Sequence, residues 1–404
     1  MFKRLIHYAE KYYHFSAIAE SMEDSRINPS IPAVAIFKLT AFLFMLRMSS
    51  LNSMDEFRKE DVQKIRMQKL IDSKYPSADS IAYSLERFNL IKLRKAIHRI
   101  YALQQRRHIV KKERVGKFLV LSMDGHELFS SKKRCCEKCL QRKVGKDDDS
   151  SIEYYHRVVV AQLVGGKMCN PLDMEPILPG EDEVNAAMRL FKRIMRDYPK
   201  AFDVVTVDGL YLRSSFIKML RSHGKDVVCV IKDERRELMA DALGIFNFQE
   251  PQIKKEGSDY YERWDEENFT SWDSLGFSIR VVRSKEKVCG KGKIYSSDWL
   301  WATTLSKAKA NTETICFIGH HRWDIENQGF NEAVNFYHIN HCFVHHPQAI
   351  QAILLIFFII YILHNAFYHL NLKKPLRQRH TFKHFVILFT SEFVLLLTNP
   401  TRAP

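Results

Sequence analysis

The sequence predicts an α/β protein: a mixed β-sheet flanked by helices, with an N-terminal helical domain and a mostly β insertion. Residues 1–112 carry helical patterns. From residue 113, short apolar runs bounded by turn residues alternate with helical patterns, an order typical of a sheet covered by helices. Residues 233–298 are polar and fit this alternation poorly, so we interpret them as a largely β insertion.

The chain is long and strongly basic. Its 404 residues suffice for two or three domains with a real core. Lys and Arg total 62 against 47 Asp and Glu, a net charge of +15 that favours nucleic acid as a partner; a generic basic surface is the alternative. The 8 cysteines are too few for a disulfide scaffold, and no secretory signal is evident. We therefore expect a cytoplasmic, nucleoid-associated protein.

The N-terminal domain, residues 1–112, is expected to bind DNA. An apolar helix is predicted over residues 33–48, and Ser77 offers N-cap chemistry before a second helix. A stretch rich in Lys and Arg follows between residues 92 and 114. A basic helix face can track DNA phosphates without reading the sequence, whereas a solvated helix face is the alternative.

The first part of the sheet domain, residues 113–232, is predicted to run β-β-β-α-β-α-β. A polar excursion with three cysteines, residues 126–152, separates the first two strands. Acidic residues open the first helix, as the helix dipole prefers, and Gly224 follows the second. The expected strands are 118–124, 156–164, 174–178, 202–208 and 227–231, and the expected helices are 181–198 and 214–222.

The second part, residues 299–372, is predicted to resume the sheet at 299–304 and to close with an apolar helix after Pro347. The uninterrupted apolar run 352–363 is shorter than the about 20 residues that cross a membrane. We therefore expect a buried helix packed against the sheet and no membrane partner; a basic protein anchored in a membrane is the alternative. Residues 373–404 are expected to form a basic C-terminal tail, with the basic run 373–380 peripheral.

Three carboxylates stand where an active site is expected. Asp124 and Asp208 each end an apolar run and precede a glycine, and Glu326 begins a long helical pattern. A single Asp-Gly after a strand is usually a turn, so the inference depends on the two matching strand ends together with the third carboxylate. Carboxylates so placed can converge, and hard oxygen ligands suit Mg²⁺ or Mn²⁺. Two such ions can stabilise the attacking and leaving oxygens when a phosphodiester bond is cleaved.

The order of elements, the two Asp-Gly strand ends and the segment 318–331 resemble the insertion-sequence DDE transposases over residues 113–370. The resemblance implies an RNase H-like catalytic core in which Asp124, Asp208 and Glu326 bind two divalent ions, normally Mg²⁺. It implies cut-and-paste DNA transposition, with cleavage at transposon ends and strand transfer into target DNA. The implied partners are double-stranded DNA, as terminal inverted repeats and as target, and a second copy of the chain in a synaptic homodimer.

The third motif of the best-matching branch is Tyr, two residues, Arg, three residues, Glu, six residues, Lys. Arg322 and Glu326 match this spacing, whereas Gly319 and Ala333 occupy the Tyr and Lys positions. The resemblance implies that Arg322 contacts the DNA end. Arg322 and Glu326 are four residues apart and share a helix face, so a salt bridge between them is the alternative.

Side chains beside the motif are also expected to contact DNA. His320 or His321 is placed to assist Arg322, and Asn327 lies in the same helical region. The two departures from the motif indicate either a different branch with its own phosphate contacts or lost activity. We favour the different branch because all three carboxylates are present; a domesticated or inactive relative that binds DNA without transposing is the alternative.

The excursion after Asp124 offers a second metal site. Cys136-x-x-Cys139 has the spacing of half a zinc site. Cys136, or its neighbour Cys135, would complete a tetrahedron with Cys139, His126 and His156 if the loop folds back. The alternative is unliganded thiols on a basic, DNA-facing loop. The basic side chains expected to contact DNA there are Lys132, Lys133 and Arg134.

A later cluster combines histidines with a cysteine. Histidines four residues apart can bind zinc, but no acidic residue sits beside these. We interpret them as polar or DNA-facing groups rather than a metal site: His341, His345, His346 and Cys342.

Overall fold

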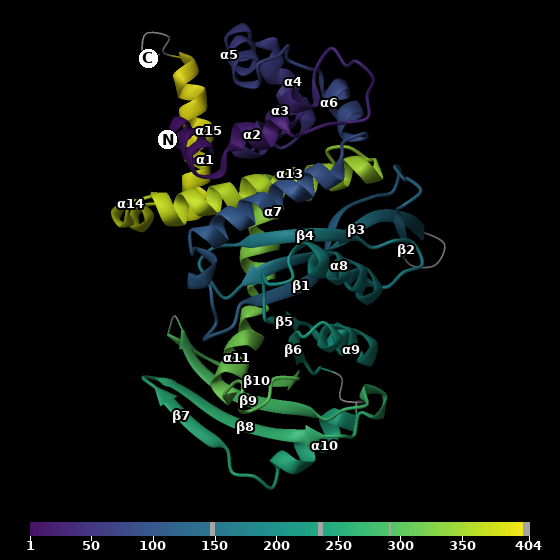
Figure 1. Cartoon of the computed structure of the whole chain (residues 1–404), viewed down its shortest axis with the longest axis vertical. Helices are drawn as coiled ribbons and strands as arrows, with labels where there is room; N and C mark the ends of the chain where they lie inside the picture. The colour runs from purple at the N-terminus through teal and green to yellow at the C-terminus, as the bar shows by residue number, and fades with distance from the viewer. Residues whose placement is uncertain (146–149, 233–236, 291, 399–404) are drawn as a thin grey trace.

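The computed structural model describes residues 1–145, 150–232, 237–290 and 292–398. The molecule is elongated: the N-terminal helices lie at one end, a long sheet runs through the middle, and the strands of the insertion lie at the other end (Figure 1). The mixed sheet flanked by helices that the sequence predicts is confirmed.

The N-terminal 112 residues are helical, as predicted. The predicted N-cap Ser77 accepts a hydrogen bond from the backbone N–H of Ser80 at 3.2 Å, and Asn89 caps the following helix in the same way. The elements are α1 (Phe2–Tyr13), α2 (Phe15–Glu20), α3 (Ala33–Met45), α4 (Leu51–Lys59), α5 (Asp61–Ile71), α6 (Ala78–Leu85), α7 (Leu90–Arg106) and η1 (Val110–Lys112).

One continuous sheet spans the rest of the molecule. Its strands are β1 (Val120–Ser131), β2 (Leu140–Val144), β3 (Ser151–Val164), β4 (Asn170–Pro176), β5 (Val204–Val207), β6 (Asp226–Val230), β7 (Gln252–Glu256), β8 (Asp259–Phe269), β9 (Ile279–Gly290) and β10 (Lys293–Thr303). They are ordered β2-β3-β1-β5-β6-β10-β9-β8-β7, and β4 also pairs with β3. Strand β1 is antiparallel to β3 and parallel to β5, which is parallel to β6.

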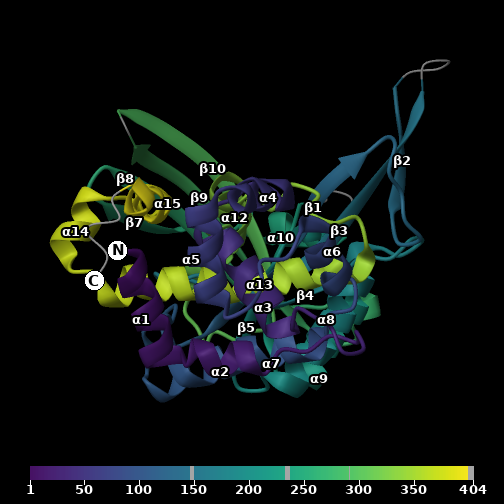
Figure 2. The same ribbon diagram turned by 90° about the horizontal axis from the view of Figure 1, so that it is seen from above.

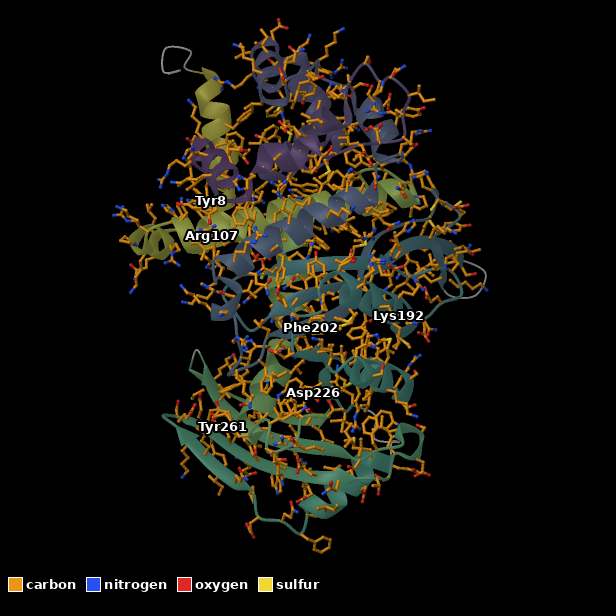
Figure 3. All side chains as sticks on the ribbon, in the orientation of Figure 1. Tyr8, Arg107, Lys192, Phe202, Asp226 and Tyr261 are labelled. Atoms are coloured by element: carbon orange, nitrogen blue, oxygen red, sulfur yellow. The ribbon has the colours of Figure 1, made fainter. Side chains whose placement is uncertain are left out.

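Two buried cores lie on opposite faces of the central part of the sheet, and Figure 3 shows side chains between the sheet and the helices there. Because successive residues of a strand point to opposite faces, Val120 packs into one core while Leu121 and Met123 pack into the other. The first core is completed by the N-terminal helices with α11 (Thr312–His321), α12 (Asn331–Tyr337), α13 (Pro347–Ala366), η6 (Phe367–Asn371), α14 (Lys374–Arg379) and α15 (Phe382–Thr398). The second is completed by α8 (Glu183–Asp197), α9 (Ser214–Ser222) and α10 (Glu237–Phe246).

Helix α13 runs through the first core. Among the described residues, the stretch Pro347–Asn371 is the one long and apolar enough to cross a membrane by length and composition. In this structure it is buried inside the protein, in contact with β4, α3 and α7, as predicted for a core helix. Its polar His364 is accommodated because the Tyr337 hydroxyl lies 2.8 Å from Nδ1.

Strand β1 does not end at Asp124, contrary to the sequence prediction. It continues to Ser131 because β3 pairs with it throughout, with Asp124 opposite Val160 and Ser131 opposite Tyr154. The end of β1, strand β2 and the start of β3 form a projecting hairpin arm, residues 126–144 and 151–157 (Figure 2). Of the predicted polar excursion, residues 126–131, 140–144 and 151–152 are therefore strand; residues 146–149 lie outside the described ones.

The insertion is largely β, as predicted, but it extends the same sheet. Strand β10 begins inside the insertion and ends beside β6, where Trp301 stands opposite Val230. A single strand therefore crosses the expected boundary between residues 298 and 299. Residues 233–236 and 291 of the insertion lie outside the described residues.

The C-terminal tail is only partly peripheral. The basic run 373–380, which includes α14, is exposed or half-buried as predicted, whereas α15 packs into the protein. Along α15, Phe385, Phe389 and Phe393 recur every four residues and form one buried apolar face. The rings of Phe393 and Phe2 lie 5.4 Å apart, so the end of the chain packs against its beginning. Residues 399–404 lie outside the described residues.

Candidate active site

Asp124 lies on β1, and Asp208 directly follows β5, the neighbouring parallel strand. The last parallel pair of β1 and β5 is Ser122 opposite Thr206, so each aspartate lies two residues further along the chain. Alternate residues share a face, and on that face the Ser122 hydroxyl donates to the backbone carbonyl of Arg322 at 3.4 Å. The strand register thus brings the two predicted aspartates together beneath the segment that carries Glu326.

Glu326 reaches the site from a helical segment with an unusual turn. Helix α11 ends at His321, and a π-helical turn, η5 (Ile325–Phe330), carries Glu326 before α12 begins. Turns of this kind often occur at functional sites. Arg322 Nη1 lies 2.9 Å from a Glu326 oxygen and 3.4 Å from an Asp124 oxygen. One guanidinium nitrogen therefore joins a strand carboxylate to a helix carboxylate.

The site concentrates negative charge. Burial, opposed by the charge of Arg322 and reinforced by the carboxylates of Glu183 and Glu326, raises the pKa of Asp124 to about 7. Like charges and burial both disfavour ionised carboxylates, so this cluster favours an added cation.

Asp208 is paired with a lysine that sequence reasoning missed. Lys232 Nζ lies 2.8 Å from an Asp208 oxygen. Burial opposes the ionisation of Asp208, but hydrogen bonds from Lys232 and the Gly209 N–H, with the charges of Lys232 and Arg322, hold its pKa below the usual range. Lys232 follows the end of β6, which is parallel to β5. Its position just after a predicted strand was the feature of the sequence that could have placed it near Asp208.

A fourth carboxylate, Glu183, lies behind Asp124. Its oxygens accept hydrogen bonds from Tyr211 and from Arg157, each at 2.8 Å. A Cβ on Gly125 would lie 2.1 Å from a Glu183 oxygen, so any other residue after Asp124 would displace this carboxylate from its hydrogen bonds. In the sequence, Glu183 was recognised only as one of the acidic residues in the first turn of a helix. Its contact with Gly125 depends on the tertiary structure.

The chemistry of the three carboxylates is the kind that divalent cations prefer. Asp124, Asp208 and Glu326 supply hard carboxylate oxygens from three separate elements, and Arg322 acts electrostatically on all three. In this structure the positive charge beside them comes from Arg322 and Lys232.

The residues expected to contact DNA fall into two groups. Arg322 is only 1% exposed, and it forms the salt bridge to Glu326 that was the alternative to a DNA contact. His321 is half-buried, with Nδ1 2.8 Å from an Asp324 oxygen. The others are exposed: Asn327, Lys132, Lys133 and Arg134.

Packing explains both departures from the third motif. A Cβ on Gly319 would lie 2.3 Å from the indole nitrogen of Trp301, so no tyrosine fits there. Ala333 is buried in the core beside α13 rather than facing the carboxylates. Trp301 itself is fully buried, stacked on Trp299 at 5.9 Å between ring centroids.

A metal-ligand cluster forms beside the hairpin arm, with one change from the predicted set. Cys136, Cys139 and His156 come together as predicted, and the fourth member is His345. Their ligand atoms all lie within 4.8 Å of one another. Burial, with the nearby His345, lowers the pKa of His156 to about 4, so its imidazole is neutral at pH 7, the form that binds metals.

His126 does not belong to this cluster, contrary to the prediction. Its strand position places it against η5, where its ring stacks on Phe330 with 4.4 Å between centroids. His345 was interpreted as a polar or DNA-facing group; the fold instead carries it to the cysteines from a position 206 residues away.

Comparison with known proteins finds only distant likenesses, all among solved structures. No family model matches the chain, and a search of curated proteins found no match. Among solved structures, the NurA nuclease from Sulfolobus solfataricus is similar at 10% identity with a TM-score of 0.25, over 55% of this chain and 83% of that chain. So low a TM-score supports no inference about fold or function.

Proposed function

We propose that this chain is a DNA transposase of the DDE class that cleaves DNA at the ends of a transposable element and transfers the strand into target DNA. The observation that carries the proposal is the grouping of Asp124, Asp208 and Glu326 around Arg322. The proposal includes an RNase H-like core, supported by a central mixed sheet with helices on both faces.

The residues of the proposed site have two different roles. Asp124, Asp208 and Glu326 offer the carboxylate oxygens for two divalent ions, with Mg²⁺ the first choice. Bound there, such ions stabilise the attacking and leaving oxygens of an in-line displacement. Arg322 and Lys232 hold these carboxylates in place, and the more exposed Lys232 carries positive charge suited to a DNA phosphate.

Basic side chains outside the site supply affinity for double-stranded DNA. The exposed Lys132, Lys133 and Arg134 lie in the connection between β1 and β2, and the chain as a whole carries a net charge of +15. A second copy of the chain, bound at the other transposon end, is part of the proposal.

Excision from a plasmid carrying the native flanking DNA of this gene tests the proposal. Intact protein and Asp208→Asn are compared in Mg²⁺, and mobility shifts on the same DNA measure binding separately. We expect excision by the intact protein alone and binding by both. Binding without excision by either protein would instead support a DNA-binding relative that does not transpose, and equal excision by both would remove Asp208 from the reaction.

A further inference from the structure

Four metal-ligating side chains meet where the hairpin arm passes the start of α13. We propose that Cys136, Cys139, His156 and His345 hold one structural zinc ion, which fastens the hairpin arm to the body of the protein. The two cysteines come from the connection between β1 and β2, His156 from β3, and His345 from the segment before α13.

The distances suit a single tetrahedral ion. With zinc–sulfur and zinc–nitrogen bonds of usual length, a tetrahedron has edges of about 3.8 Å between sulfurs and about 3.5 Å between sulfur and nitrogen. The two sulfurs are 3.7 Å apart, and Cys139 Sγ lies 3.3 Å from His156 Nε2 and 3.2 Å from His345 Nε2. Cys136 Sγ lies 3.4 Å from His156 Nε2. The four ligand atoms are therefore already placed around one point.

The surroundings are those of a closed, structural site. Cys139 and His156 are buried, and the ring of Phe129 lies 5.5 Å from His156 and 5.6 Å from His345. The backbone N–H of Cys136 donates to Cys139 Sγ at 3.2 Å, which suits a thiolate ligand. Four protein ligands leave no open position for a reacting water, so the ion would be structural rather than catalytic.

The short distances also favour zinc over an iron–sulfur cluster. In a two-iron centre held by two cysteines and two histidines, the cysteine pair and the histidine pair bind different irons. Here Cys139 Sγ is as close to both histidines as ligands of one ion would be.

The ion would link two segments that are far apart in the sequence. His345 lies 206 residues from Cys139 in the chain, and the next residue, His346, caps α13 through its side chain. Fixing the arm there would also fix the basic residues that immediately precede the cysteines, Lys132 to Arg134. The zinc thus positions the proposed DNA-facing loop relative to the buried core helix.

Metal analysis of the purified full chain tests this proposal without any assay of activity. We expect about one zinc per chain, lost in Cys139→Ser and in His345→Ala. The matched controls are Cys135→Ser, an exposed neighbouring cysteine, and His126→Ala, the histidine outside the cluster; both should keep the zinc. After replacement of zinc by Co²⁺, the intact protein should show the visible bands of a tetrahedral site with thiolate ligands.

Three results would overturn the proposal. The first is intact protein that carries no zinc and takes up none after thiol reduction and zinc addition. The second is stoichiometric iron in place of zinc. The third is zinc retained in His345→Ala but lost in His126→Ala. Should the ligand variants fail to fold, the zinc content and Co²⁺ spectrum of the intact protein decide the question.

Discussion

A single buried arginine organises the charges of the candidate site. Arg322 contacts Asp124 and Glu326 directly, and its charge helps to lower the pKa of Asp208. Moving a guanidinium out of water is costly, and the paired carboxylates offset that cost. The buried arginine and the carboxylates therefore stabilise one another. Replacing either partner should leave the charge of the other uncompensated.

Replacing Arg322 with Met should leave two carboxylates without their cation. We expect the free energy of unfolding of the metal-free protein to fall by about 2 kcal/mol or more. The loss should be smaller than for a fully buried ion pair, because Glu326 is partly exposed. Added Mg²⁺ should raise the Tm of Arg322→Met more than that of the intact protein. Thermal unfolding with and without Mg²⁺ measures both effects. Arg213→Met, which breaks a surface pair with Asp182, is the control and should cost under about 1 kcal/mol.

Glu332 should make stability depend on pH. Burial, opposed by a hydrogen bond from Tyr361, raises its pKa from 4.5 to about 7. Between these values the folded state holds a proton that the unfolded state has lost, so stability falls as pH rises through this window. Glu332→Gln should therefore stabilise the protein at pH 8, on the order of 2–3 kcal/mol, and change little at pH 4. Denaturant unfolding at the two pH values checks this, and an equal effect at both would contradict it.

At the scale of elements, the approach of α11 to β10 sets the position of Arg322. Gly319 allows the helix to lie directly on the indole of Trp301. Arg322 follows three residues later, just past the end of the helix. A change in the contact between Gly319 and Trp301 should therefore shift Arg322 in the active site.

Gly319→Ala should push α11 away from β10. The added Cβ would lie 2.3 Å from Trp301 Nε1, and a buried indole has little room to move. We expect a loss of about 1–3 kcal/mol in stability, together with reduced DNA cleavage. Gly244→Ala in α10 is the matched control, because its Cβ meets nothing within 4 Å; it should be neutral or stabilise by up to about 1 kcal/mol. Equal effects of the two changes on chemical denaturation would remove the packing explanation.

Helix α15 should contribute strongly to stability. Phe389 is fully buried, its ring 5.3 Å from that of His364 and 4.6 Å from that of Phe385. We expect Phe389→Ala to cost about 3–5 kcal/mol, measured by denaturant unfolding. Ser391→Ala, on the exposed side of the same helix, should change stability by less than about 0.5 kcal/mol. A peripheral tail would instead make both changes neutral.

At the scale of the whole molecule, one sheet connects the two ends. The N-terminal helices and α13 cover one face, α8 and α9 cover the other, and the insertion continues the sheet beyond β6 (Figure 1). Over this frame the chain carries a net charge of +15. Such an excess favours DNA binding that weakens steeply with salt.

Neutralising the basic loop should reduce that salt dependence. The variant combines Lys132→Ala, Lys133→Ala and Arg134→Ala. If all three side chains contact phosphates, the slope of log K against log salt should fall by up to about 2.7. Fluorescence anisotropy with duplex DNA at several salt concentrations measures the slope. A triple alanine variant at the exposed Lys255, Lys287 and Lys293 of the insertion is the control. An unchanged slope in the first variant would remove the loop from the DNA interface.

Local patterns in the chain suffice for much of the architecture. Apolar runs identify the strands, capping residues such as Ser77 identify helix starts, and the Asp-Gly pairs at Asp124 and Asp208 single out two of the three carboxylates. These features depend on interactions over a few residues, so they can be recognised without knowing the fold. The mixed sheet, its flanking helices and the β insertion were accordingly predicted.

Contacts between distant segments were decided only by the tertiary structure. The pairing of β3 along all of β1 moved Asp124 from a strand end to mid-strand, and it also formed the hairpin arm. Lys232 at Asp208, Glu183 behind Gly125, and His345 in place of His126 each depend on a segment far away in the chain. A sequence pattern records what each residue can do, but the partner that it meets is set by strand register and helix packing, which are properties of the whole chain.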